Sequence, residues 1–249
     1  MAGRRSLSDE LADSLLVEIL DGIYPAGMLP PEAVLAERWR LSRLTVREAV
    51  KILQSKSVLV VRQGSGTQIN PVDEWSPLDP TLLLARFRHN AGDLDLPKRF
   101  IEARRLVEVG VAEIAAARRT EQHLNDLASA LGDMKKASKV ADVSVFVDAD
   151  ILFHQVVMDA AANAFVSALF DPLAQILHVT RQQTSSFAPI RKHAIAHHQK
   201  ILDALTLGDP EGARKAMSDH MAQTERDINT YVADGRALID ATQHLRDAN

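Results

Sequence analysis

Residues 42–70 restrict the possible folds of this chain more than any other stretch does. Ser42 is a favourable N-cap, and apolar residues follow it at helical spacing, which predicts a helix to about residue 55. We expect its inner face to consist of Leu44, Val46, Val50 and Leu53. Two short runs rich in β-branched residues come next, at 58–62 and 67–70, around a loop that contains Gly64 and Gly66. Such runs predict a β-hairpin whose tip needs positive φ.

The preceding residues complete a recognisable order of elements. Helical spacing of apolar residues predicts helices over 7–20 and 32–39, and the stretch between them, DGIYPAGMLPP, is typical of a turn with a short extended piece. Helix, helix, helix and hairpin is the order of a winged helix-turn-helix. We therefore expect a domain of this kind over residues 1–72.

Basic residues are concentrated in the same region, although the whole chain carries a net charge of −4. The segment from Arg38 to Arg62 contains seven basic residues and a single acidic one. Clustered Lys and Arg are typical of phosphate binding, while a solvated basic face is the plain alternative. Arg43 and Arg47 lie four residues apart and share a helix face, from which arginine can bind guanine with two hydrogen bonds. The residues expected to contact double-stranded operator DNA are Ser42, Arg43, Thr45, Arg47, Lys51, Arg62, Gln63 and Gly64.

The rest of the chain is predicted to be helical, which makes the protein mainly α. Three prolines and three acids in NPVDEWSPLDP indicate a linker, placed at 73–80. Low glycine content and helical periodicity then favour an antiparallel bundle of about seven helices over 81–235, followed by a C-terminal tail at 236–249. The expected helices run over 80–89, 96–119, 120–136, 142–162, 164–183, 186–207 and 210–233.

Cysteine is absent, which excludes disulfides, thiolate metal sites and a cysteine nucleophile. No run of 18 or more apolar residues predicts a membrane span, and the first residues, MAGRRS, lack the apolar core of a signal peptide. We expect a cytoplasmic protein.

Four short motifs in the first 70 residues resemble the N-terminal domain of GntR-family transcription regulators. They are LPPE at 29–32, LAE at 35–37, LSRLTVREAV at 41–50 and GSGT at 64–67. The resemblance implies that Arg43 and Arg47 contact bases or phosphates, and that Gln63 and Gly64 lie in the minor groove. Ala33 departs from the family pattern, in which the residue after the helix-opening glutamate is often arginine.

The region after residue 80 resembles the FadR-type subfamily, whose effector domain is called FCD. The matching motifs are EARRLVE at 102–108, DILFH at 150–154, AN at 162–163, HQKI at 198–201 and DH at 219–220. Many members of the subfamily bind a divalent metal ion through one aspartate and three histidines. The matching positions are Asp150, His154, His198 and His220.

Helix geometry supports this ligand set. Asp150 and His154 fall on an apolar stripe, whereas Asp148 belongs to another face. His198 and His220 are each 11 residues from Asp209, so two antiparallel helices joined there would hold them at nearly the same height. Zn²⁺ is the metal we expect, and Ni²⁺, Mn²⁺ or Fe²⁺ also suit oxygen and nitrogen ligands. A buried Asp–His pair with two unrelated core histidines is the alternative.

A small carboxylate would complete such a metal's coordination, so the expected effector is an organic or sugar acid. Its expected contacts are Arg104, Glu108, Asn163 and Arg181, although Arg104 and Glu108 could instead simply pair with each other. The sequence thus favours a ligand-responsive repressor that binds a palindromic operator as a homodimer. A metal-dependent hydrolase and a helical scaffold are the competing hypotheses.

Overall fold

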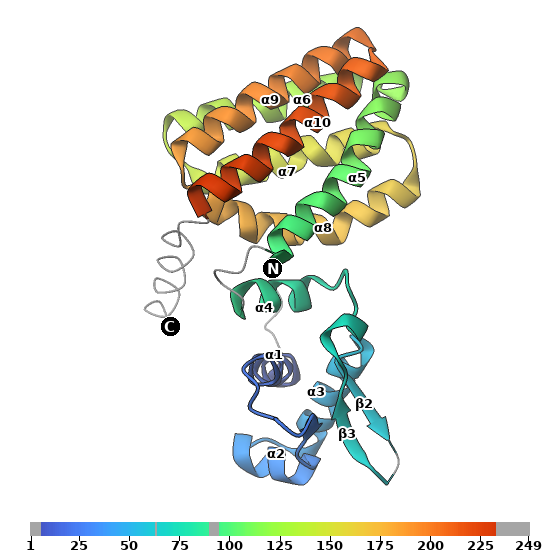
Figure 1. Cartoon of the computed structure of the whole chain (residues 1–249), viewed down its shortest axis with the longest axis vertical. Coiled ribbons are helices and arrows are strands. Elements are labelled where there is room, and N and C mark those ends of the chain that lie inside the picture. The colour runs from blue at the N-terminus through green and yellow to red at the C-terminus, as the bar shows by residue number, and fades with distance from the viewer. Residues whose placement is uncertain (1–5, 63, 90–94, 233–249) are drawn as a thin grey trace. The chain divides into compact units, whose positions relative to one another are not determined.

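The computed structural model describes residues 6–62, 64–89 and 95–232. The chain divides into two compact units, Met1–Asn90 and Ala91–Asn249. Each is mostly helical, as predicted (Figure 1). None of the helices in the described ranges combines the length and apolar composition that crossing a membrane requires.

The first unit is a winged helix-turn-helix, which confirms the predicted order of elements. Its elements are α1 (Leu7–Leu20), β1 (Met28–Leu29), α2 (Glu32–Trp39), α3 (Arg43–Ser55), β2 (Leu59–Arg62), β3 (Gly66–Ile69), a 3-10 turn η1 (Val72–Glu74) and α4 (Pro80–His89). The strands form an antiparallel sheet in the order β1-β3-β2, in which Val60 faces Gln68. Gly64 and Gly66 at the hairpin tip have φ of 77° and 84°, the positive values that the loop requires.

The inner face of α3 differs from the prediction at one position. Ser42 caps the helix, because its Oγ accepts a hydrogen bond from the backbone N–H of Thr45 at 3.0 Å. The side chains that α3 buries against α1 and the sheet are Val46, Ala49, Val50 and Leu53. Leu44, which we expected among them, is 67% exposed. It occupies the first turn, on the side of the helix that faces away from the buried stripe.

The segment expected to be a linker instead packs onto the first unit. The indole of Trp75 is buried in that unit's core, and its Nε1 donates a hydrogen bond to the backbone carbonyl of Asn70 at 2.9 Å. Nζ of Lys56 lies 2.9 Å from both carboxylate oxygens of Asp79. Helix α4, which we placed in the second domain, packs against α1 and buries Leu82. The boundary therefore falls near residue 90 instead of residue 80, because these apolar side chains anchor the proline-rich segment.

The second unit consists of helices whose bounds lie within a few residues of those predicted. They are α5 (Asp95–Arg118), α6 (Glu121–Lys139), α7 (Val143–Ala160), α8 (Ala164–Thr184), α9 (Ala188–Leu207) and α10 (Pro210–Asp227), with a π-helical turn η2 (Ile228–Val232) after α10. The predicted tail at 236–249 lies outside the described residues.

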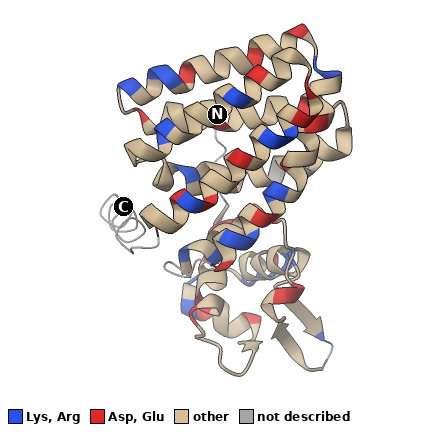
Figure 2. Ribbon diagram, turned by 45° about the horizontal axis from the view of Figure 1, so that its top comes forward, with Lys and Arg blue, Asp and Glu red and all other residues tan. Residues whose placement is uncertain are grey.

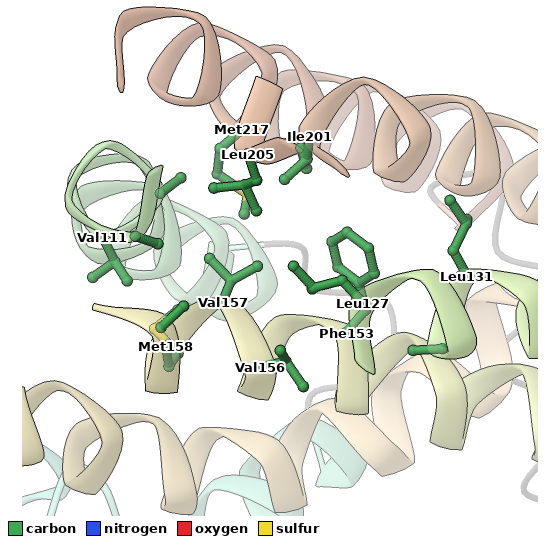
Figure 3. Close-up of a cluster of buried hydrophobic side chains, with 14 of the residues drawn as sticks. Val111, Leu127, Leu131, Phe153, Val156, Val157, Met158, Ile201, Leu205 and Met217 are labelled. Carbon is green, nitrogen blue, oxygen red and sulfur yellow. The ribbon is translucent and has the colours of Figure 1, made fainter. Parts of the chain in front are cut away.

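Five of these helices form a closed ring around an apolar core, and α8 packs outside it against α7. Around the ring, α5 contacts α7, α7 contacts α6, α6 contacts α9, α9 contacts α10, and α10 returns to α5. Figure 3 shows core side chains from opposite sides of the ring, Phe153 and Val157 from α7 and Leu205 from α9, pointing toward one another. Acidic and basic residues are interspersed along these helices (Figure 2). The ring encloses polar as well as apolar side chains.

Candidate metal centre and DNA-reading helix

The turn between α9 and α10 aligns two histidines. Gly208 ends α9 with φ of 66°, a left-handed conformation that favours glycine. Asp209 then caps α10 by accepting a hydrogen bond from the backbone N–H of Gly212 at 3.0 Å. The helices leave this turn antiparallel, and the rings of His198 and His220 are 4.6 Å apart between centroids. The equal-height prediction is consistent with this spacing.

His154 joins these two histidines from α7. Its ring centroid lies 5.1 Å from that of His198 and 5.2 Å from that of His220. One ligand nitrogen from each of the three side chains falls within 4.8 Å of the others, and all three residues are buried. This spacing is one in which three histidines could hold a metal ion.

Asp150 lies one helical turn before His154 and is fully buried. Its Oδ1 is 3.3 Å from Nε2 of His198, and its Oδ2 pairs with the guanidinium of Arg181 on α8. Although Oδ1 of Asp150 and Nε2 of His198 are this close, they form no hydrogen bond with each other, and Nε2 of His220 has no hydrogen-bond partner among the described residues either. Buried polar atoms are rarely left unpaired, because the lost hydration is not replaced.

The surroundings of His198 and His220 favour the uncharged form of their imidazoles. Burial lowers the pKa of His198 and of His220 well below 6.5, and the neighbouring imidazoles add to the effect. Both side chains are therefore neutral at pH 7. A neutral imidazole is the form that binds a metal ion.

Two of the three histidines also have an acceptor beside Nδ1. Nδ1 of His198 lies 2.7 Å from the carbonyl oxygen of Ala194, and Nδ1 of His154 lies 2.6 Å from Oε2 of Glu108. The Ala194 carbonyl can hold the proton of His198 on Nδ1, which leaves Nε2 of that ring free to bind a ligand, whereas the His154–Glu108 contact is close but not aligned as a hydrogen bond. The Ala194 contact is a backbone interaction, so side-chain patterns in the sequence carry no signal for it.

A buried ion pair from α5 borders the cluster. Nε of Arg104 donates to Oε1 of Glu108 at 2.6 Å, and both side chains are about 1% exposed. Burial raises the pKa of the Glu108 carboxyl, but Arg104 and His154 outweigh that effect and hold it well below its usual range. Nη2 of Arg104 has no hydrogen-bond partner within the described chain. The predicted pair thus forms, with one guanidinium donor left over.

Arg181 and Asn163 were the remaining effector candidates, and their surroundings differ. Burial and the nearby Arg104 lower the pKa of Arg181 to about 9, and its Nη2 lies 3.4 Å from Nε2 of His154. Asn163 is exposed and caps α8 by accepting a hydrogen bond from the backbone N–H of Phe165 at 3.1 Å. Asn163 thus has a local capping role, and its effector role stays a prediction.

On the first unit, α3 presents a basic outer face. Arg43, Arg47 and Lys51 are exposed, as are Arg62 and Gly64 on the wing. Nε of Arg47 donates to a carboxylate oxygen of Glu32 at 3.2 Å, so an acid at the start of α2 holds this guanidinium. The hydroxyls of Ser42 and Thr45 are 2.8 Å apart at the helix start. Gln63, also predicted to contact DNA, lies outside the described residues.

Comparison with known proteins identifies both units. Residues 7–69 match the family described as bacterial regulatory proteins, gntR family, and residues 99–223 match the FCD domain. A protein of Escherichia coli (strain K12), named as the regulatory protein of an L-lactate dehydrogenase operon, is 33% identical over 230 residues, which cover 88% of this chain and 84% of that protein.

Other relatives extend the likeness. The galactonate operon transcriptional repressor of Escherichia coli (strain K12) is 28% identical, with 88% of this chain and 95% of the repressor covered. The solved structure of Lar, described as controlling the expression of the Listeria monocytogenes agr system, shares the fold, with a TM-score of 0.64 and 18% identity over 92% of this chain and 99% of its own.

Proposed function

Because the chain belongs to the gntR family of bacterial regulatory proteins and carries an FCD domain, we propose that it is a repressor whose second unit binds a divalent metal ion together with a small organic or sugar acid. At the coarser level it is a ligand-responsive, DNA-binding transcription regulator, and not an enzyme. Family membership gives the hydrolase alternative no support. The observation that carries the finer proposal is the buried Asp–His cluster with its unpaired ligand atoms.

The DNA contacts that we propose come from α3 and the wing. Arg43 and Arg47 would bind bases or phosphates in the major groove, with Lys51 on the same face, while Arg62 and Gly64 would approach the minor groove. One short recognition helix covers only a few base pairs, so we propose that the protein acts as a homodimer on a palindromic operator. The exposure of these basic side chains supports their proposed contacts with DNA.

The residues of the buried Asp–His cluster suit a divalent metal ion. Asp150, His154, His198 and His220 would supply one oxygen and three nitrogen ligands, the set expected from the sequence. The neutral forms of His198 and His220, the carbonyl acceptor at Nδ1 of His198 and the unpaired Nε2 atoms of both rings favour metal binding. The ion would supply positive charge for an anionic effector to bind. We propose Zn²⁺, with Ni²⁺, Mn²⁺ and Fe²⁺ to be tested beside it.

Charge balance connects the metal to a carboxylate effector. The formal charges of Arg104 and Arg181 are already matched by those of Glu108 and Asp150 in the same buried cluster. A divalent ion would therefore add two uncompensated positive charges to the interior, which is costly unless an anion accompanies it. The unpaired Nη2 of Arg104 offers that anion a hydrogen-bond donor. Two relatives are named for the operons of L-lactate dehydrogenase and of galactonate, and lactate and galactonate are both small hydroxy acids.

The DNA proposal is tested by replacing Arg47 with alanine. We expect operator affinity, measured by fluorescence anisotropy, to fall by about tenfold or more, because a good base contact contributes roughly 1–3 kcal/mol of discrimination. Arg99→Ala, at an exposed arginine of α5, is the matched control and should bind as wild type does. Unchanged affinity and specificity in Arg47→Ala would refute this role.

The metal and effector proposals are tested on the purified full chain. Elemental analysis should find about one divalent ion per chain in the wild type and much less in His154→Ala. Thermal-shift screening of lactate, galactonate and related acids should then find stabilisation that depends on the ion. If neither protein contains metal and added metal ions stabilise neither, the metal proposal is wrong. If metal binds but no carboxylate adds stability, only the effector class is wrong.

A further inference from the structure

One apolar side chain stands on the outward side of α3, beside its basic side chains. Successive residues of an α-helix are rotated by about 100°, so the buried stripe of α3 defines the direction of the core. On this basis Leu44 points about 170° away from the middle of the stripe formed by Val46, Ala49, Val50 and Leu53. Its exposed fraction of 67% agrees with this direction. Leu44 therefore projects straight out from the domain.

Most neighbours of Leu44 are side chains proposed to read DNA; Glu48, one turn further along, is the exception and pairs with Lys51 at 2.9 Å. Arg47 and Lys51 lie on the same outward side of the helix, one and two turns further along, and Arg43 precedes it. Ser42 and Thr45, the other residues of the first turn, direct their hydroxyls toward each other at the helix cap. In this turn Leu44 therefore points straight outward, while Arg43 is exposed beside it, about 70° from the middle of the buried stripe. The first turn is also the part of a recognition helix that meets base edges.

We propose that Leu44 reads a thymine, by packing its side chain against the 5-methyl group in the major groove. A leucine side chain has no hydrogen-bonding group, so it cannot recognise the donors and acceptors on base edges. Among the four bases, thymine alone presents an apolar group in the major groove. Leu44 would select a T·A pair in each half-site, beside guanines read by Arg43 and Arg47. This proposal rests on the DNA-binding role of α3.

A single exposed leucine also occurs on ordinary protein surfaces, so the test must detect the methyl group itself. The operator is first obtained by selecting bound duplexes from a random-sequence library with the full-length protein. Each thymine of the selected half-site is then replaced by deoxyuridine, which removes one methyl group and keeps every hydrogen bond. Affinities are compared by fluorescence anisotropy at one fixed salt concentration.

For the wild type, one deoxyuridine substitution per half-site should weaken binding about fourfold, the effect of one buried methyl group. Leu44→Ala should bind the thymine duplex more weakly than wild type does, and should bind thymine and deoxyuridine duplexes equally within about twofold. Val17→Ala is the matched control, because Val17 is a similarly exposed aliphatic residue, on α1. It should keep the wild-type response to deoxyuridine. Thermal melting of both variants checks that they fold as the wild type does.

The possible results separate this proposal from the function on which it rests. If the wild type selects no sequence, the DNA-binding proposal itself fails. If it selects a sequence whose half-sites contain no thymine, or if no deoxyuridine substitution weakens binding, the Leu44 proposal is overturned while DNA binding stands. Leu44→Ala retaining the full fourfold response would overturn it equally.

Discussion

Replacing His220 with leucine separates a metal centre from an ordinary buried core. His220 is 2% exposed, and its Nε2 has no hydrogen-bond partner among the described residues. Leaving such an atom unpaired costs about 1–3 kcal/mol, whereas fitting a leucine of different shape costs less than about 1.5 kcal/mol. In the absence of metal, we therefore expect the variant to be as stable as the wild type or more stable by about 1 kcal/mol.

Metal should reverse this order. At a free Zn²⁺ concentration of about 100 times the Kd, binding stabilises the folded wild type by about 2.7 kcal/mol. For a unit of this size, 1 kcal/mol moves the Tm by about 2–4 °C, so the wild type should gain roughly 5–11 °C. His220→Leu lacks one nitrogen ligand and should lose most of that gain.

The assay is differential scanning calorimetry of each protein after chelation and again with Zn²⁺. His178→Leu is the matched control, because His178 is exposed and pairs with Asp148 at the surface, 3.0 Å away. It should keep the full metal-dependent gain in Tm. His220 is not a metal ligand if Zn²⁺ does not stabilise the wild type. The same follows if His220→Leu loses equal stability with and without metal, as replacement of a purely structural core residue would.

Three further perturbations have defined outcomes. Glu32→Gln should raise operator affinity by about twofold to fivefold, because it removes the half-buried acid that holds Arg47; a decrease measured by anisotropy would contradict this. Metal-free protein should lose stability below about pH 6.5, by roughly 1.4 kcal/mol per pH unit for each of His198 and His220. Their pKa is lowered in the folded state, so the unfolded chain takes up protons that the folded chain excludes; urea melts that show no such slope, or the same slope in His220→Leu, would refute it. Trp75→Ala should destabilise the first unit by about 3–5 kcal/mol, while Trp75→Phe loses about 1 kcal/mol; a free linker at this position predicts no change in thermal melting for either.

Several features of the fold and the candidate site could be predicted because they depend on neighbours in the sequence. Ser42 and Asp209 are side-chain caps that start helices wherever the rest of the chain lies. Counting residues from Asp209 was enough to place His198 beside His220, since two helices joined by a tight turn must run back along each other. The same local logic placed Asp150 and His154 on one buried stripe.

Other features could not be predicted because they depend on which distant surfaces meet. Leu44 and Val46 are both apolar and both suit a helix, and only the packing of α3 against α1 and the sheet decides that one is buried and the other exposed. Trp75 lies in a stretch whose prolines and acids are typical of a linker, yet a pocket in the first unit's core accepts its indole. Asparagine is a residue type that often binds ligands, but the position of Asn163 directly before α8 makes it the cap of that helix.

The sequence by itself therefore determined the helices, the hairpin and the family, and it supplied the four residues proposed as metal ligands, because caps, periodicity and motifs act over one or two turns. The tertiary structure alone decided where the first unit ends, that Arg181 pairs with Asp150, that Glu108 lies beside His154, and that Leu44 faces outward. Tertiary packing decides which residues far apart in the chain come into contact, and local helix or strand propensity carries no information about those contacts.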